Sequence, residues 1–235
     1  MLDTDYRLNG AKAPCSGAGH LRHALVTAHM ESGEQRMLLI ELPSHVYADL
    51  SGWESHGMRA TASGRIPLDG IHLTPEALIG EAGDYLRQPD FSAGAWRTSA
   101  VTLGGLEALV AEMRRQLIAR GRDRDLHQRV RVGKALIAQE TARSWVQRAA
   151  EIGEGNEGDA GYVANLVNLA RIAVESACLD TIRIVQRALG LAGFRRGEFV
   201  ELLFRDLSMY LRQPAPDETL TEAAGYFMVR DPSEP

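Results

Sequence analysis

The apolar residues of this chain change their spacing at about Phe91, and this change most constrains the fold. From there to Leu211 they recur at the spacing of amphipathic helices. Short turns separate the helical segments, so we expect them to pack as an antiparallel up-down bundle. Gly104 and Gly105 interrupt the first segment, and we expect another helix to approach its backbone closely there. The predicted helices cover residues 95–119, 126–152, 159–189 and 199–211.

The first third of the chain has the short apolar runs and frequent glycines of β-structure. Residues 24–28 and 37–42 are two such runs, and the segment Glu31–Glu34 between them predicts a hairpin turn because it contains Gly33. Pro67 cannot donate a ladder hydrogen bond, so we place the segment 62–71 at a sheet edge.

These patterns predict the α+β fold class: a partial antiparallel β-barrel or sheet followed by a four-helix up-down bundle. We place the partial β-domain over 1–85 and the bundle over 86–216. The segment 217–235 shows no clear period, and we expect it to be a C-terminal tail.

Composition and charge narrow the setting and the partners. The chain has 26 Lys and Arg against 31 Asp and Glu, and its net charge of −5 argues against nucleic acid or an anionic membrane as the main partner. No run approaches the ~20 apolar residues of a membrane span, and the first ten residues lack the pattern of a secretory signal. Cys15 and Cys178 belong to no metal-ligand spacing, and Cys178 lies in an apolar helical stripe, which predicts a buried, inert thiol. We therefore expect a cytoplasmic protein.

Six short segments carry further information through their order and spacing. They are Tyr6–Lys12 with Cys15–Ala18, Gly57–Thr61, Leu78–Gly83, His127–Gln128, Leu189–Phe194 and Arg205–Asp206. Together they resemble the acyl-CoA dehydrogenase family over about Tyr6 to Gln213. The resemblance implies the C-terminal part of that family's fold, without its N-terminal helical domain and first β-strands.

The resemblance also implies a flavin contact, with FAD as the cofactor. Ser16 matches the position whose hydroxyl and backbone meet the reactive edge of the isoalloxazine ring. Two positions earlier the family commonly has an aromatic residue that packs on the flavin, whereas this chain has Pro14, which cannot stack in the same way. A simple turn serine is the alternative for Ser16.

Four further cofactor positions fall on the predicted bundle. By resemblance, Gln128 beside His127 lies near the cofactor at a subunit interface, and Arg122 or Arg124 reaches a neighbouring subunit's pyrophosphate. Gly190 and Gly193 match a turn whose backbone N–H groups approach the adenine-nucleotide end of the cofactor. The alternatives are a polar first helical turn for Gln128, a solvated charged turn for Arg122, and a helix C-cap for the two glycines.

The residues leave the catalytic base unassigned. The family's reaction needs a carboxylate to remove the α-proton, commonly a glutamate shortly after the arginine-aspartate pair or in the first bundle helix. Here the segments Leu207–Pro214 and Phe91–Arg97 contain no acid, and Asp217 reaches the site only by a loop shift. No Glu-x-x-His pair is present, so we expect no bundle metal site.

The resemblance implies an FAD-dependent oxidation of an acyl thioester or a related substrate. We expect the chain to act as a homo-oligomer, or as a hetero-oligomer with a chain that supplies the missing N-terminal half. A flavin oxidase or monooxygenase on the same fold is a related reading. The alternative is a non-catalytic oligomerisation or scaffold protein that has lost flavin chemistry.

Overall fold

The computed structural model describes residues 5–43, 46–155 and 158–233. The chain divides into two units, Met1–Arg87 and Gln88–Pro235, each with its own core. We describe each unit by itself.

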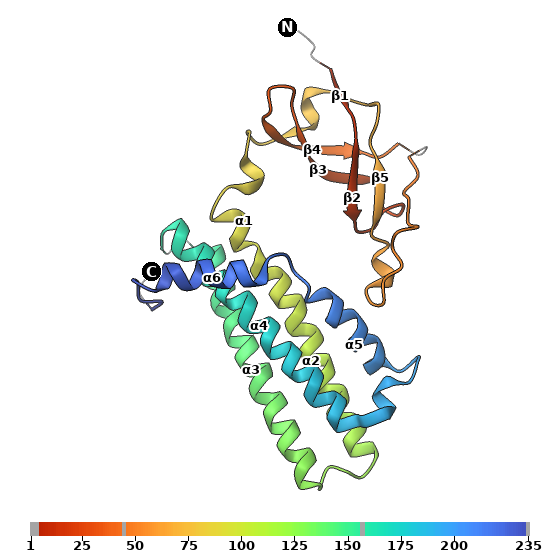
Figure 1. The fold of residues 1–235 in the computed structure, drawn as a ribbon, viewed down its shortest axis with the longest axis vertical. Coiled ribbons are helices and arrows are strands. Elements are labelled where there is room, and N and C mark those ends of the chain that lie inside the picture. The colour runs from red at the N-terminus through yellow and green to blue at the C-terminus, as the bar shows by residue number, and fades with distance from the viewer. Residues whose placement is uncertain (1–4, 44–45, 156–157, 234–235) are drawn as a thin grey trace. The chain divides into compact units, whose positions relative to one another are not determined.

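The first unit is built from short antiparallel strands (Figure 1). Three small sheets pair β1 with β6, β2 with β5, and the central strand β4 with both β3 and β7. The hairpin predicted around Gly33 is confirmed, since β3 and β4 pair directly from His29 and Gln35 outward. Pro67 lies in β5 opposite Ala11 of β2. The strands are β1 (Tyr6–Leu8), β2 (Ala11–Cys15), β3 (His23–His29), β4 (Gln35–Glu41), β5 (Gly64–Pro67), β6 (Ile71–Leu73) and β7 (Leu78–Ile79), with short 3₁₀ turns η1 (Arg59–Thr61), η2 (Pro75–Ala77) and η3 (Asp84–Leu86).

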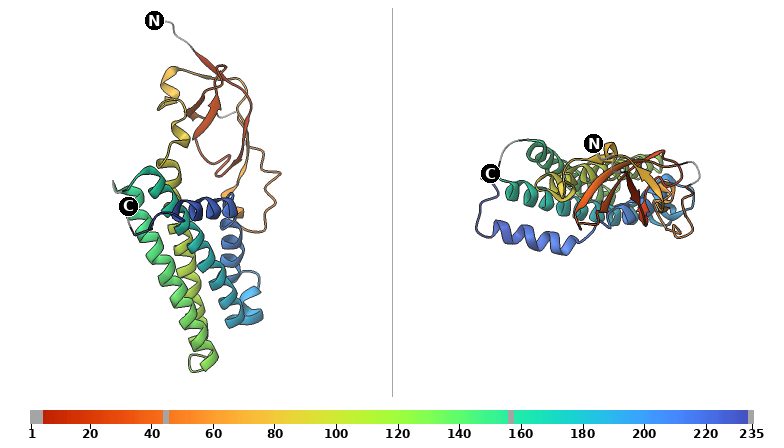
Figure 2. Two further views of the ribbon diagram at one scale, coloured as in Figure 1. Left: turned by 60° about the vertical axis from the view of Figure 1, so that its left-hand side comes forward. Right: turned by 90° about the horizontal axis from the view of Figure 1, so that it is seen from above.

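The second unit is a helical bundle, and the α+β fold class is thereby confirmed. Its long helices α2, α3 and α4 lie side by side, and α5 packs on α2 (Figures 1 and 2). Asp125 and Asp159 begin α3 and α4 as N-caps, because each side chain accepts hydrogen bonds from N–H groups of the first turn. The helices are α1 (Asp90–Ala93), α2 (Ala95–Ala119), α3 (Leu126–Glu154), α4 (Ala160–Leu189), the 3₁₀ turn η4 (Gly190–Phe194), α5 (Phe199–Tyr210) and α6 (Pro216–Phe227).

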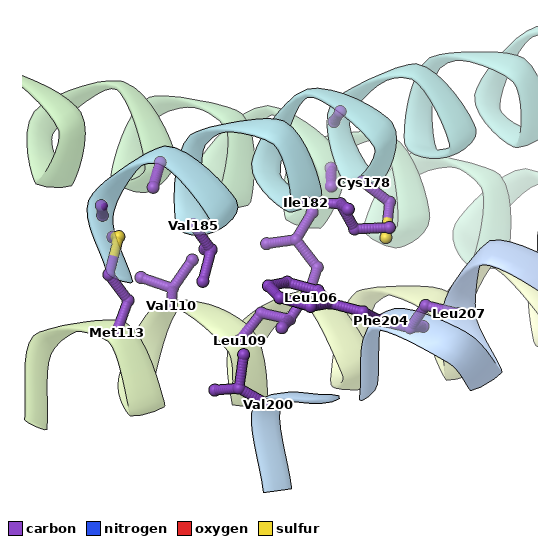
Figure 3. Close-up of a cluster of buried hydrophobic side chains, with 14 of the residues drawn as sticks. Leu106, Leu109, Val110, Met113, Cys178, Ile182, Val185, Val200, Phe204 and Leu207 are labelled. Atoms are coloured by element: carbon purple, nitrogen blue, oxygen red, sulfur yellow. The ribbon is translucent and has the colours of Figure 1, made fainter. Parts of the chain in front are cut away.

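The bundle core is made of the aliphatic stripes that the sequence displays (Figure 3). Each fully buried Leu or Val contributes about 1.5–3 kcal/mol relative to an exposed one, so these stripes hold the helices together. Cys178 is completely buried among them, as predicted. The labelled core residues are Leu106, Leu109, Val110 and Met113 of α2, Cys178, Ile182 and Val185 of α4, and Val200, Phe204 and Leu207 of α5.

A further helix, α6, lies in the segment where the sequence shows no clear period. It packs on α4 through Ala223, which is fully buried, and Phe227 meets Tyr162 of α4 edge to face at 5.9 Å. Pro216 occupies the first turn of α6, where a missing N–H costs nothing. No helix of the described residues is both long and apolar enough to cross a membrane.

Candidate functional site

The turn after β2 presents Ser16 at the surface of the β-unit. The turn is anchored to the segment before β5: the N–H of Gly17 donates to the carbonyl of Thr61 at 2.6 Å, and that of Ala18 donates to Ala62 at 3.2 Å. Gly17 has a φ of +75°, which a residue with a side chain rarely adopts. The backbone therefore fixes where the Ser16 hydroxyl lies.

Three hydroxyl groups form a chain that ends at Ser16. Ser16 Oγ lies 2.9 Å from Ser63 Oγ, and Ser63 Oγ lies 2.9 Å from Thr61 Oγ1. Thr61 Oγ1 donates to the carbonyl of Met58 at 2.7 Å.

The direction of this chain follows from counting protons. A hydroxyl has one proton, and Thr61 gives its proton to the Met58 carbonyl, so Ser63 donates to Thr61 and Ser16 donates to Ser63. Ser16 therefore turns its lone pairs, rather than its proton, outward. Ser16 can donate outward only if the chain reverses and Thr61 gives up its bond to Met58, at a cost of about 1 kcal/mol.

On the bundle, Gln128 of α3 points into the protein. Its side chain is only 2% exposed, and its Nε2 donates to the carbonyl of Ala188, near the end of α4, at 3.5 Å. Its Oε1 is buried without a hydrogen-bond partner within the described residues. A buried, unpaired acceptor costs about 1–3 kcal/mol and calls for an explanation.

A pocket of about 350 Å³ adjoins Gln128. Aliphatic and charged side chains of α2, of α3 and of the turn between them line it, and Arg122 and Gln128 are both among them. The structure thus brings these two predicted residues together. The apolar part of the lining consists of Leu117, Ile118, Val132 and Leu136.

Arg122 is engaged by the acid that caps α3. Its Nη2 lies 2.9 Å from Asp125 Oδ2, while Asp125 Oδ1 accepts from the N–H groups of His127 and Gln128. The hydrogen bond from Arg122 is the main reason that the pKa of Asp125 is lowered, and the bonds from the helix N–H groups add to it. Much of the Arg122 charge is therefore compensated within its own turn.

The two predicted glycines differ in environment. Gly190 ends α4 with φ +61° and ψ −147°, a region that glycine alone adopts readily, and nothing lies within 4 Å of where a side chain would begin. Gly193 is buried, and a Cβ there would lie 3.4 Å from Phe204 and 3.5 Å from Val200. Gly190 thus borders open space, whereas Gly193 serves packing against α5.

Several residues that hold the end of α4 and the Ser16 hydroxyl in place were not predicted from the sequence. Arg120 donates to the carbonyl of Leu189 at 3.3 Å and also to Gln116, which is 94% buried. Gln116 follows Met113 at helical spacing and so sits on the apolar stripe of α2, which is the one available signal. Thr61 ends the segment Gly57–Thr61, but neither it nor Ser63 was linked to Ser16, because Ser16 is 47 residues from Ser63 in the chain.

Two carboxylates lie near the segments where the family's base is expected, and they differ in their surroundings. Glu201 of α5 accepts from Arg205 at 2.6 Å, and Asp217 is exposed in the first turn of α6. Within the described residues, no group of three His, Cys, Asp or Glu side chains could hold a metal ion.

No protein-family model matches this sequence, and no curated protein matches it. Solved structures do match. The indole-bound structure of TdsC from Paenibacillus sp. A11-2 is 21% identical with a TM-score of 0.77, over 98% of this chain and 66% of that one. Butyryl-CoA dehydrogenase from Megasphaera elsdenii is 15% identical with a TM-score of 0.78, over 97% of this chain and 62% of that one. The chain has an acyl-CoA dehydrogenase-like fold.

Another structure of this acyl-CoA dehydrogenase-like fold is the methanesulfinate monooxygenase MsuC from Pseudomonas fluorescens. It is 19% identical with a TM-score of 0.81, over 96% of this chain and 64% of that one. The chain therefore spans about two thirds of the length of these proteins. TdsC has been crystallised with FMN, and XiaF from Streptomyces sp. with FADH2, so this fold holds flavins in those proteins.

The residues of this acyl-CoA dehydrogenase-like chain fit a flavin in part. The outward lone pairs of Ser16 suit an N–H donor, such as N5–H of a reduced flavin, and Gln128 Oε1 is an acceptor still in need of a donor. Gly190 leaves room for close approach. Arg122 is already paired with Asp125 through one nitrogen, and Gly193 is enclosed by the core.

Proposed function

We propose that this chain is the flavin-binding component of an FAD-dependent oxidoreductase that oxidises an acyl thioester or a related substrate. The observation that carries the proposal is the exposed hydroxyl of Ser16, held in one direction by Ser63 and Thr61 on a turn with fixed backbone. The acyl-CoA dehydrogenase-like fold supports it, because flavins are bound by proteins of this fold.

We propose that Ser16 of the first unit contacts FAD, and that Gln128 and Gly190 of the second unit contact FAD of the same or of a neighbouring copy. Ser16 would hydrogen-bond the reactive edge of the ring, Gln128 would accept from a ligand N–H, and Gly190 would let the backbone lie against the nucleotide. A bound flavin would supply two-electron redox chemistry. The chain's own contribution would be to orient the ring and to favour one redox state through the direction of the Ser16 hydroxyl.

We further propose that the flavin site is completed by another polypeptide, either a second copy of this chain or a different one. Ser16 and Gly190 each border open space, whereas cofactor sites bury most of the ligand surface. The remaining contacts therefore have to come from elsewhere. The two free cysteines agree with a reducing, cytoplasmic setting.

A flavin monooxygenase is the second candidate function. It is favoured by the lack of a free carboxylate where α,β-dehydrogenation needs a base: no acid occurs in Leu207–Pro214, and Glu201 of α5 is held by Arg205. Several proteins of similar structure are named as monooxygenases or hydroxylases. On this reading, the chain would need no base at these positions.

The test is flavin binding by the purified chain, measured by visible absorbance after dialysis against FAD and, separately, FMN. We expect flavin to be retained, and Ser16→Ala to weaken the binding of reduced FAD, measured without oxygen, about fivefold through loss of the hydrogen bond from N5–H. Ser32→Ala, in the exposed β3–β4 turn, is the matched control. A folded, colourless oligomer that retains neither flavin would overturn the proposal and favour a scaffold protein. FMN retained in preference to FAD would overturn the FAD assignment alone.

A further inference from the structure

A long groove runs along the outer surface of the bundle between α3 and α4, separate from the residues assigned to flavin. Its volume is about 790 Å³, within the range of small-molecule sites. The two helices are antiparallel, since Gln128 near the start of α3 reaches Ala188 near the end of α4. From His127 to Thr141 the groove follows about 21 Å of α3, given the rise of ~1.5 Å per residue.

One end of this groove is strongly basic. Arg131 and Lys134 of α3 face it together with Arg183 and Arg187 of α4, against a single acid, Asp180. Asp180 pairs with Arg183 at 3.0 Å, and none of the other three cations pairs with a carboxylate of the described residues. The whole chain carries a net charge of −5, so this local excess of positive charge is unusual for it and favours an anionic ligand.

The other end of the groove is apolar and lined by small side chains. Ala138 of α3 and Ala173 and Ala177 of α4 line it beside Ser176, and Ile137 on its α3 side is 69% exposed. Small side chains leave room for an extended chain to lie between the helices. The exposed Ile137 would lose contact with water when such a chain is bound.

We infer that the α3–α4 groove binds a free anionic amphiphile, a single molecule with an acyl chain and a phosphate or carboxylate head. Cations line one end of the groove and small apolar side chains line the other, so the groove suits a ligand with one anionic and one apolar end. A partner helix would place its apolar stripe along the whole groove and needs opposite charges on both flanks. A second copy packed face to face about a two-fold axis at the basic end would bring like charges together.

The test uses decyl phosphate as the probe, kept below its critical micelle concentration and titrated calorimetrically into the full chain. We expect one molecule to bind per chain, with affinity that falls as salt rises. Inorganic phosphate and decyl maltoside, which each lack one half of the probe, are expected to bind at least about tenfold more weakly.

Three variants separate the two ends of the groove. Arg131→Gln is expected to weaken decyl phosphate binding about tenfold, through the head. Ser176→Phe fills the exposed small-residue end and is expected to weaken decyl phosphate binding about as much while leaving inorganic phosphate unchanged. Arg196→Gln, at an exposed arginine before α5, is the matched control and is expected to bind like the unaltered chain.

Several results would overturn the inference. One is failure of decyl phosphate to bind the unaltered chain. Another is an equal loss of decyl phosphate affinity in Arg196→Gln and Arg131→Gln, which would indicate non-specific charge attraction. Binding only to vesicles containing phosphatidic acid would assign the basic end to a membrane surface. A dimer in sedimentation that Ser176→Phe dissociates would assign the groove to a second copy.

Discussion

Gly105 of α2 lies directly against Leu207 of α5. A Cβ at position 105 would lie 2.5 Å from Leu207 Cδ2 and 3.2 Å from its Cγ, closer than carbon atoms approach. Leu207 is 6% exposed and has little room to move. Gly104, one residue earlier, has nothing within 4 Å of its missing Cβ. The glycine pair therefore confirms a close helix approach at one position and leaves the other facing solvent.

This difference predicts opposite effects of the same substitution. Gly104→Ala should raise the free energy of unfolding by up to ~1 kcal/mol, because alanine favours helix. Gly105→Ala should lower it by about 1–2 kcal/mol, because overpacking against Leu207 outweighs the gain in helix propensity. Urea unfolding followed by circular dichroism measures both. Equal stabilisation of the two variants would contradict the tight contact with α5.

The direction of the hydroxyl chain predicts how flavin binding responds to Ser63. Ser63→Ala removes the acceptor that holds the Ser16 proton, so Ser16 becomes free to donate outward. We expect oxidised FAD, whose N5 is an acceptor, to bind up to about fivefold more tightly to Ser63→Ala. Fluorescence quenching of FAD measures the affinity. Adding Ser16→Ala should abolish the gain; a gain that persists would show that Ser63 acts by another route.

The unpaired oxygen of Gln128 predicts a trade between stability and binding. Gln128→Met keeps the length of the side chain and removes the buried acceptor. The free energy of unfolding should therefore rise, or fall by less than about 1 kcal/mol. FAD affinity should fall, because the acceptor for a ligand N–H is gone. Thermal unfolding with and without FAD tests both. A clear loss of stability without FAD would instead assign the amide to holding the end of α4 through Ala188.

Asp159 predicts a pH dependence of stability. It caps α4 through the N–H of Tyr162 at 2.8 Å and accepts from Tyr226 at 3.1 Å. These bonds, the backbone bond first, lower its pKa below the ordinary value of 3.8. The contribution of ionised Asp159 to the free energy of unfolding is therefore present above pH 3.8, and it is lost as the pH falls through the lower pKa of the folded state.

The measurement compares the unaltered chain with Asp159→Asn, which keeps a capping oxygen without the charge. The urea midpoint of the unaltered chain should exceed that of the variant near pH 7, and the difference should shrink as the pH falls below 3.8. A difference that does not depend on pH would mean that the charge of Asp159 contributes nothing.

The two thiols should react at very different rates. Burial, with a smaller contribution from Glu175, raises the pKa of Cys178 to about 12, and the side chain is inaccessible. Cys15 of β2 is only half-buried. Ellman's reagent at pH 8 should therefore label one thiol rapidly and the second only on unfolding. Cys15→Ser should remove the rapid phase; rapid labelling that remains would contradict the burial of Cys178.

The sequence by itself determined the helices of the bundle and the main hairpin. Local period and capping residues decide these elements: the stripe from Leu106 to Leu117 and the N-cap Asp159 are visible in a single segment of chain. The helix α6 was not recognised, because it buries a single alanine, Ala223, and begins at a proline that also marks helix ends.

Only the tertiary structure decided what the candidate site residues do. Whether Ser16 donates or accepts depends on Thr61 and Ser63, and the amide N–H of Gln128 finds its acceptor in a carbonyl 60 residues away. The basic end of the α3–α4 groove likewise arises because two antiparallel helices bring Arg131 and Arg187 to one surface. Hydrogen-bond direction and summed charge are properties of groups brought together in space, and the order of residues along a chain does not fix them.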